Sequence, residues 1–318
     1  MEFYQSAQPF VVVVGADGFV GGALADGLNA QRVVYGAAPN SDIHITRAEE
    51  VLRKADVVIN TSGFRVRRGL SYADYQRCHE QAAAAFVPWI RQGALFIHMS
   101  SAHVLGKSQN QRLGNEAVPN PATYPCSAYA IAKLEADQFI EREAAQRDFR
   151  LVFLRPTILW SRPGDGSLPD NLVRLAKRGV ILRLYPRAAR HHLCNINILV
   201  DVARRVSMRR DLPQASALVV ADPFTVTSHE LEILIRKYLP ATAVTLPIPT
   251  TWFSALLRGT FHSSYPAFDL KTWGDILGVL NFDTVYDPFE SFRLLGIDSS
   301  QYSMEKTLLP FIQQILQP

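Results

Sequence analysis

Cysteine is scarce, because this chain of 318 residues contains only three cysteines: Cys78, Cys126 and Cys194. Because their number is odd and they lie far apart in the sequence, they form neither a disulfide framework nor the paired spacing of a zinc site. This pattern favours a reducing compartment. No run approaches the roughly 20 apolar residues of a membrane span. The N-terminus lacks the basic and then apolar segments of a signal peptide. We therefore expect a soluble, cytoplasmic protein with no metal and no membrane partner.

A strong excess of one charge is also missing. Lys and Arg number 33 against 29 Asp and Glu, a formal net charge of +4. The basic residues are dispersed without a nucleic-acid-binding motif, so we expect no nucleic-acid partner. Two tighter clusters, Arg65 with Arg67 and Arg68, and the stretch from Arg183 to His192, either face solvent or bind an anionic group.

Hydrophobic residues make up 48% of the chain, enough for a large core. Apolar runs of strand length alternate with helical patterns. We expect strands near 10–15, 32–36, 56–60, 94–100, 150–155 and 217–220, and helices near 19–29, 47–54, 72–91 and 128–146. Alternation of this kind predicts an α/β fold with a doubly wound parallel sheet.

A glycine turn follows the first of these strands. The run Val11–Val14 leads into a Gly-x-x-Gly-x-x-Gly pattern and then a helix. Glycines let the backbone turn sharply and approach a pyrophosphate, which then meets the amide groups and positive end of the helix. The alternative is a tight strand-to-helix turn without a ligand. The cofactor-binding residues that we predict here are Gly15, Asp17, Gly18, Phe19, Val20 and Gly21.

Acid-base chemistry is indicated by Tyr129 and Lys133, which lie four residues apart and so share a helix face. An ammonium held beside a phenol favours the phenolate, so the pair can exchange protons with a carbonyl or an alcohol. Upstream, Ser100 and Ser101 end a buried strand, and the carboxyl ends of parallel strands line the ligand crevice. We predict that Ser101 hydrogen-bonds the substrate oxygen, while Lys133 also reaches the nicotinamide ribose. The alternative is a serine pair that merely ends a strand.

Taken together, these residues make the chain resemble the extended short-chain dehydrogenase/reductases, the NAD-dependent epimerase/dehydratase family that includes 4-keto-sugar reductases. The resemblance covers nearly the whole chain. It implies a Rossmann domain over 1–165, to which 196–224 returns, and a smaller substrate-binding lobe mainly from 166–195 and 225–318. It also implies a homodimer through helices 72–91 and 128–146. The further cofactor contacts that it implies are Asp42, Ile43, Asn60, Thr61, Ser62, Gly63, Lys133 and Pro156.

Two of the chain's departures from the family pattern bear on the cofactor and on the reaction. Where an acid would bind the adenosine ribose of NAD, Val34–Asn40 contains neither a carboxylate nor an Arg, so the cofactor is NAD or NADP, with a slight preference for NADP. The run Ser101-Ala102-His103 lacks the acidic pair of the dehydratases, which disfavours elimination chemistry. The substrate contacts that we predict are Ser101, His103, Arg187, Arg190 and His192.

Three hypotheses remain open. The first is an NAD(P)-dependent oxidoreductase that reduces or oxidises a carbonyl or alcohol on a sugar or nucleotide-sugar-like small molecule, with catalytic Tyr129, Lys133 and Ser101. The second is a nucleotide-sugar epimerase that retains NAD. The third is a non-catalytic dinucleotide-binding protein, which the intact set of three catalytic residues disfavours.

Overall fold

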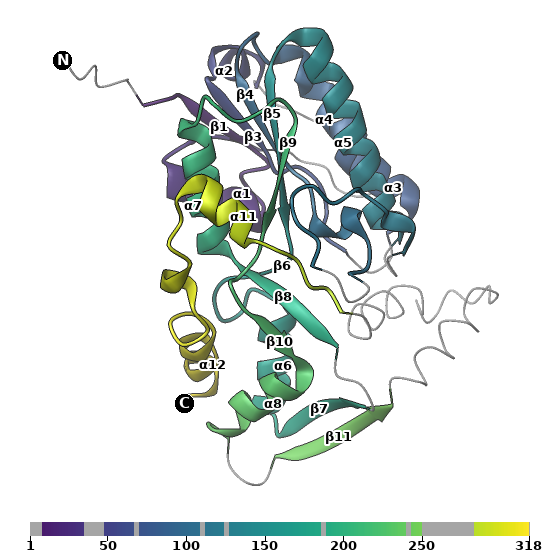
Figure 1. Cartoon of the computed structure of the whole chain (residues 1–318), viewed down its shortest axis with the longest axis vertical. Coiled ribbons are helices and arrows are strands. Elements are labelled where there is room, and N and C mark those ends of the chain that lie inside the picture. Colours follow the sequence, from purple (N-terminus) through teal and green to yellow (C-terminus); the bar gives the residue numbers. More distant parts are fainter. Residues whose placement is uncertain are drawn as a thin grey trace.

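A six-stranded parallel sheet forms the upper part of the molecule (Figure 1). In spatial order its strands are β2 (Gln31–Val33), β1 (Val11–Val14), β3 (Val57–Asn60), β4 (Leu95–Met99), β5 (Arg150–Pro156) and β9 (Ser216–Val220). The central strands are mostly apolar, as expected where helices cover both faces of a sheet. The predicted doubly wound α/β fold is confirmed. The winding direction changes beside β1, where sheets of this type bind ligands.

This computed structural model describes residues 8–34, 48–66, 70–108, 112–123, 127–185, 189–239, 243–249 and 283–317. The predicted contacts Asp42, Ile43 and Arg187 lie outside these ranges, as does the segment 250–282 of the predicted substrate lobe. Within the described residues, no helix has the length and apolar character needed to cross a membrane.

Helices cover the two faces of the sheet separately (Figure 1). On one face lie α1 (Phe19–Leu28), α7 (Ile196–Met208) and α11 (Phe289–Leu295). Their apolar side chains share a core with one set of alternating strand residues, including Val13 and Ile59. On the other face lie α2 (Glu49–Lys54), α3 (Tyr72–Gln76), α4 (Ala82–Phe86) and α5 (Ser127–Arg147). There the ring of Phe96 on β4 packs between those of Phe86 and Phe149.

The helix predicted over 72–91 runs from Tyr72 to Trp89 and changes its winding along the way. A π-helical segment, η1 (Arg77–Gln81), separates α3 from α4, and a 3-10 turn, η2 (Val87–Trp89), follows α4. Such π segments are common at functional sites because they redirect side chains within a helix. In this segment Cys78 and His79 are both buried.

A smaller lobe lies below the carboxyl edge of the main sheet (Figure 1). It contains the three-stranded sheet of β10 (Thr225–Thr227), β8 (Arg190–Asn195) and β6 (Ile158–Trp160), and the parallel pair β11 (Val244–Pro249) and β7 (Val180–Tyr185). The helices α6 (Leu168–Lys177), α8 (Ser228–Arg236) and α12 (Leu308–Leu316) pack against these strands. The lobe has its own core, in which Trp160 and Phe311 meet edge-on at 5.0 Å between ring centroids. The predicted division into domains stays a prediction.

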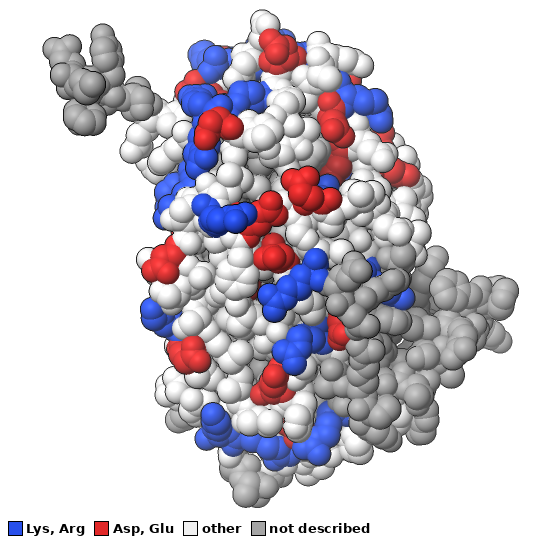
Figure 2. Space-filling view, in the orientation of Figure 1, with Lys and Arg blue, Asp and Glu red and all other residues white. Residues whose placement is uncertain are grey.

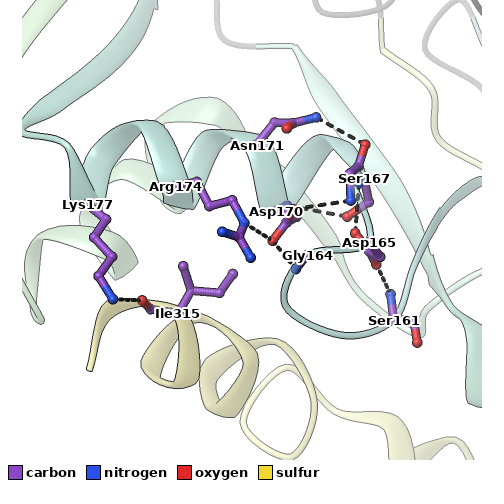
Figure 3. A network of polar contacts seen from close by, with 10 residues as sticks. Ser161, Gly164, Asp165, Ser167, Asp170, Asn171, Arg174, Lys177 and Ile315 are labelled. Atoms are coloured by element: carbon purple, nitrogen blue, oxygen red, sulfur yellow. Dashed lines mark hydrogen bonds and ion pairs between the residues drawn. The ribbon is translucent and has the colours of Figure 1, made fainter. Parts of the chain in front are cut away.

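Two carboxylates hold the loop between β6 and α6 (Figure 3). Asp170 accepts the backbone N–H groups of Gly164 at 2.8 Å and Gly166 at 3.2 Å, and the Nε–H of Arg174 at 2.9 Å. Asp165 accepts backbone N–H groups on both sides of the loop. Hydrogen bonds to the buried side chain of Asp170 thus fix the loop that leads into the helix α6 of the smaller lobe.

Charges of both signs are mixed on the face shown in Figure 2, where Lys and Arg side chains lie among Asp and Glu. Several basic residues pair with acids, such as Arg209 with Asp211 at 2.6 Å. In the second predicted basic cluster, Arg183 on β7 pairs with Glu232 on α8 at 2.6 Å. The positive charge of Arg183 is therefore balanced within the lobe.

Candidate active site

The turn after β1 packs its glycines against the loop after β3. Gly15 has a φ of +81°, and its N–H donates to the carbonyl of Val33 at 2.9 Å. A Cβ on Gly21 would lie 2.1 Å from the carbonyl oxygen of Gly15 and 2.5 Å from Oγ1 of Thr61. No side chain fits at that position, so the glycine pattern is required by the way the backbone crosses itself.

The start of α1 offers donors to an anion. The helix begins at Phe19 after Gly18, which has no side chain to cap the first amide groups. Asp17, Gly18 and Phe19 are exposed and Val20 is half-buried. Amide groups and a positive helix end at the switch point of the sheet fit the pyrophosphate of a dinucleotide. The binding roles of these residues stay predictions.

The loop after β3 lies beside this turn. Thr61 donates its hydroxyl to the carbonyl of Val14 at 2.7 Å, and the Ser62 N–H donates to Oδ1 of Asn60 at 2.9 Å. Gly63 has a φ of +121°, and a Cβ there would lie 2.1 Å from Nδ1 of His79. The π-helical segment therefore brings a histidine ring against the predicted cofactor loop.

Tyr129 lies among three aromatic rings near the start of α5. Tyr75, His79 and His103 each meet its ring edge-on, with centroid distances of 5.5, 5.6 and 6.0 Å. His103 belongs to a 3-10 turn, η3 (Ala102–Leu105), whose backbone N–H at His103 donates to Oγ of Ser101 at 3.2 Å. The structure thus brings Tyr129 to the end of β4, where Ser101 lies.

Lys133 is buried one helical turn after Tyr129. Its side chain crosses to β4, where Nζ donates to the carbonyl of Met99 at 2.8 Å. Burial lowers the pKa of Lys133 to about 8, against the negative charge of Asp137, which raises it. The ammonium is therefore still mainly protonated at neutral pH and lies at the carboxyl end of the strand.

The two serines at the end of β4 have different surroundings. Ser100 donates its hydroxyl to Oδ2 of Asp137 at 2.6 Å, so it points into the interior. Ser101 caps η3 instead. Ser101 thus lies at the end of β4 beside His103, and its contact with the substrate oxygen stays a prediction. Burial lowers the pKa of His103 to about 4, so this neighbour is neutral near pH 7.

The end of β5 adds a residue that the sequence analysis missed. Pro156 pairs with Val220 on β9, and the N–H of Thr157 donates to the Val220 carbonyl at 3.1 Å. Oγ1 of Thr157 is buried and, within the described residues, has no hydrogen-bond partner. An orphaned hydroxyl at this edge fits a polar group of a bound ligand. The signal was a hydroxyl residue directly after a strand end.

The predicted substrate contacts Arg190 and His192 on β8 have hydrogen-bond partners within the protein. Arg190 is exposed and donates from Nη1 to Oγ1 of Thr225 at 3.2 Å. His192 is buried and accepts the N–H of Tyr286 at Nδ1, at 2.9 Å. Burial lowers the pKa of His192 to about 4. Binding of substrate by Arg190 and His192 stays a prediction.

Sequence reasoning also missed a buried polar cluster beneath the site. His98 on β4, Asp137 on α5 and Arg155 on β5 are all buried. For His98 and Arg155, the sequence signal was a polar residue inside an otherwise apolar strand, Leu95–Met99 for the first and Arg150–Pro156 for the second. Such residues need partners inside the protein.

The model of the NAD dependent epimerase/dehydratase family matches residues 11–182, more than half of the chain. No curated protein matches it by sequence. It is similar to the structure of MoeE5 in complex with UDP-glucuronic acid and NAD, with 16% identity, a TM-score of 0.70, and 96% of this chain and 98% of that chain covered.

Two further solved structures are similar over nearly their full lengths. RMD from Pseudomonas aeruginosa complexed with NADPH has 15% identity and a TM-score of 0.66, with 97% of this chain and 99% of that chain covered. UDP-glucuronic acid 4-epimerase from Bacillus cereus, in complex with UDP-glucuronic acid and NAD, has 14% identity and a TM-score of 0.67, with 96% and 99% covered. At these identities the likeness shows the fold.

Proposed function

This chain belongs to the NAD dependent epimerase/dehydratase family, and we propose that it transfers a hydride between NAD(P) and a carbonyl or alcohol of a sugar or nucleotide-sugar-like substrate. As a member of that family it is an NAD(P)-dependent enzyme of the extended short-chain dehydrogenase/reductase type. One observation carries the proposal. Tyr129 and Lys133 lie on neighbouring turns of α5 at the end of β4, beside Ser101 and at the same sheet edge as the Gly15 turn.

Each of the three side chains has a defined part in a reduction. When bound, NAD(P)H supplies the hydride. The hydroxyl of Tyr129 donates its proton to the substrate oxygen, and the hydroxyl of Ser101 donates a hydrogen bond to the same oxygen. The ammonium of Lys133 stabilises the phenolate that remains and holds the ribose. In the oxidation direction Tyr129 takes the proton back.

The surroundings of Tyr129 suit this role. Burial holds the pKa of His79 well below its usual range and lowers that of His103 to about 4, so both rings are neutral near pH 7. The positive charge that acts on the phenol then comes from Lys133 and not from these two histidines. Edge-on contacts with three rings restrict the motion of the phenol, as proton transfer requires.

A sugar substrate is supported by the similar structures, which hold UDP-glucuronic acid with NAD, or NADPH. Because residues 34–40 contain no carboxylate to repel a 2′-phosphate, NADP is our preferred cofactor. Elimination is disfavoured, since Ala102 and His103 stand where the dehydratases carry acids. A homodimer and a cytoplasmic location stay predictions.

Net reduction is the function that we propose first. The second candidate is an epimerase, favoured by the similarity to UDP-glucuronic acid 4-epimerase. The two differ in their handling of the cofactor. A reductase releases oxidised cofactor after each turnover, whereas an epimerase regenerates and retains it.

Mass spectrometry of the small molecules released by denaturing freshly purified, undialysed protein separates these candidates. NAD in a one-to-one ratio with the chain would favour the epimerase and count against net reduction. Protein that is empty, or that carries NADP, would favour the reductase. In that case turnover is sought by following NADPH consumption with 4-keto-sugars and their nucleotide-linked forms.

A further inference from the structure

A chain of buried polar side chains connects the predicted cofactor loop with α5. Asn60 ends β3 and pairs in register with His98 on β4. The ring of His98 lies between Asn60 and Asp137, with Nδ1 3.0 Å from Nδ2 of Asn60 and Nε2 3.5 Å from Oδ1 of Asp137. All three residues are at least 97% buried. Buried polar groups of this kind are costly unless each has a partner.

The directions of these contacts follow from the loop. The N–H and the hydroxyl of Ser62 donate to Oδ1 of Asn60, at 2.9 and 2.6 Å, which fixes the amide with Nδ2 toward His98. Nδ2 donates to Nδ1 of His98, so the proton of the neutral ring is on Nε2 and faces Asp137. Burial and the charge of Lys133 hold the pKa of His98 well below its usual range, so the ring is neutral.

Asp137 is the acid at the end of this chain. Its Oδ2 accepts the hydroxyl of Ser100 at 2.6 Å and lies 4.0 Å from Nη2 of Arg155. Burial raises the pKa of Asp137 to about 6, against Arg155, the Ser100 hydrogen bond and Lys133, which lower it. At neutral pH the group is therefore mainly a carboxylate. It follows Lys133 by one helical turn, on the same face of α5.

We propose that Asp137 is a positioning residue whose carboxylate, one helical turn after Lys133 on the same buried face of α5, keeps Lys133 protonated. Asp137 acts on the reaction through Lys133 and touches neither substrate nor cofactor. Its effect on turnover rests on the proposed function, but its effect on Lys133 does not.

The groups around Lys133 support this assignment. Cys78 and His79 face it from the π-helical segment and His98 faces it from β4. The pKa of the Cys78 thiol is raised by burial, and both histidines are neutral, so near pH 7 none of the three carries a balancing negative charge. Beyond Asp137, Arg155 on β5 and Glu141 on α5 act on that carboxylate. Burial lowers the pKa of Lys133, and the charge of Asp137 is the main interaction that opposes this effect.

The test replaces the charge and keeps the shape. Asp137→Asn is compared with Glu143→Gln, which removes a carboxylate from the same helix where it pairs with Arg147 at 2.7 Å. The pKa of Lys133 is measured without cofactor by NMR titration of protein labelled at the lysine side chains, and Lys133→Arg assigns its signal. We expect the pKa of Lys133 to fall by about one unit or more in Asp137→Asn, and to stay at the wild-type value in Glu143→Gln. An unchanged pKa in folded Asp137→Asn would overturn the proposal.

A second variant covers the case in which Asp137→Asn does not fold. Ser100→Ala removes the hydrogen bond that favours the ionised form of Asp137 and deletes a single atom. More of Asp137 is then protonated near pH 7, and the pKa of Lys133 should fall in the same direction by a smaller amount. A Lys133 pKa equal to that of the wild type in Ser100→Ala would then count against the proposal.

Turnover gives an independent reading. Once a substrate is found, the alkaline limb of the pH profile of kcat/KM should move to lower pH in Asp137→Asn by the same amount as the Lys133 titration. A fall of the Lys133 pKa without any turnover on sugar carbonyls would support the inference and contradict the proposed function. An alkaline limb that stays in place while turnover persists would contradict the inference and leave the proposed function intact.

Discussion

Gly21→Ala is predicted to disrupt the turn after β1, whereas Gly22→Ala is tolerated. The Cβ at Gly21 would lie 2.1 Å from the carbonyl oxygen of Gly15, well inside van der Waals contact, and that oxygen belongs to the backbone and cannot rotate away. The Cβ at Gly22 would lie 3.5 Å from the carbonyl oxygen of Ala16, an ordinary contact. The two variants add the same methyl group to adjacent residues of α1.

The expected free energies follow from this difference. Both variants gain up to about 1 kcal/mol from replacing a glycine in a helix by alanine. Only Gly21→Ala has the overpacking cost of about 1–3 kcal/mol, and contact with rigid backbone favours the upper end. We therefore expect Gly22→Ala to be as stable as the wild type or more so. Gly21→Ala should be less stable than Gly22→Ala by about 1–3 kcal/mol.

Chemical denaturation measures the free energy of unfolding, and titration with NADH and NADPH, followed by fluorescence, measures cofactor affinity. If the added methyl group of Gly21→Ala displaces the Gly15 carbonyl, this variant should bind the cofactor more weakly than the wild type. Gly22→Ala should bind it almost as the wild type does. Equal stability and equal cofactor affinity in the two variants would refute the close approach of Gly21 to Gly15 and the cofactor site argued from it.

Two acids give predictions about stability and pH. Hydrogen bonds from Arg183 hold the pKa of Glu232 at about 2, so the stabilisation by Glu232 is present above about pH 4.5 and is lost as the pH falls toward 2. Glu232→Gln should lower the free energy of unfolding by about 1–2 kcal/mol at pH 7. If urea denaturation shows the same difference in unfolding free energy between wild type and variant at pH 3 as at pH 7, this prediction is wrong. Burial raises the pKa of Asp222 to about 7, although it accepts hydrogen bonds from Asn195 and Trp160. Its stabilisation is thus complete below about pH 3.8 and lost as the pH rises through 7. Between pH 5 and 8 the wild type should therefore lose about 2.5–3 kcal/mol of stability that Asp222→Asn retains. Parallel pH dependences of the two unfolding free energies would contradict this prediction.

The parts of the fold that could be predicted are those with a local signal. Strands such as Val11–Val14 and Val57–Asn60 are buried on both faces, so their apolar runs are continuous and bounded by turns. The predictions of the fold class, of the family and of NAD or NADP as the cofactor are confirmed. The Gly15 turn and the Tyr129 helix could be recognised because sequence spacing alone sets the residues that they present.

What could not be predicted depends on packing between distant segments. The π-helical segment η1 within the helix 72–91 brings His79 against Gly63, a contact between distant segments that no local sequence pattern indicates. In the sequence, Arg183 and Arg190 belong to one basic stretch, yet Arg183 lies on β7 and Arg190 on β8, which belong to different small sheets. The sequence around Asp137 does not indicate that this acid is buried, because its neighbours His98 and Arg155 lie on the distant strands β4 and β5.

The proposed function depends most directly on Tyr129 as the proton donor. Tyr129→Phe removes only the phenolic oxygen, so the ring contacts with Tyr75, His79 and His103 remain. The decisive measurement compares single-turnover rates of wild type and Tyr129→Phe with a saturating dinucleotide and a sugar carbonyl, together with the cofactor Kd of each. We expect a rate lower by a factor of about 10²–10⁴ with a nearly unchanged Kd. A variant that reduces the carbonyl at the wild-type rate would contradict this role of Tyr129.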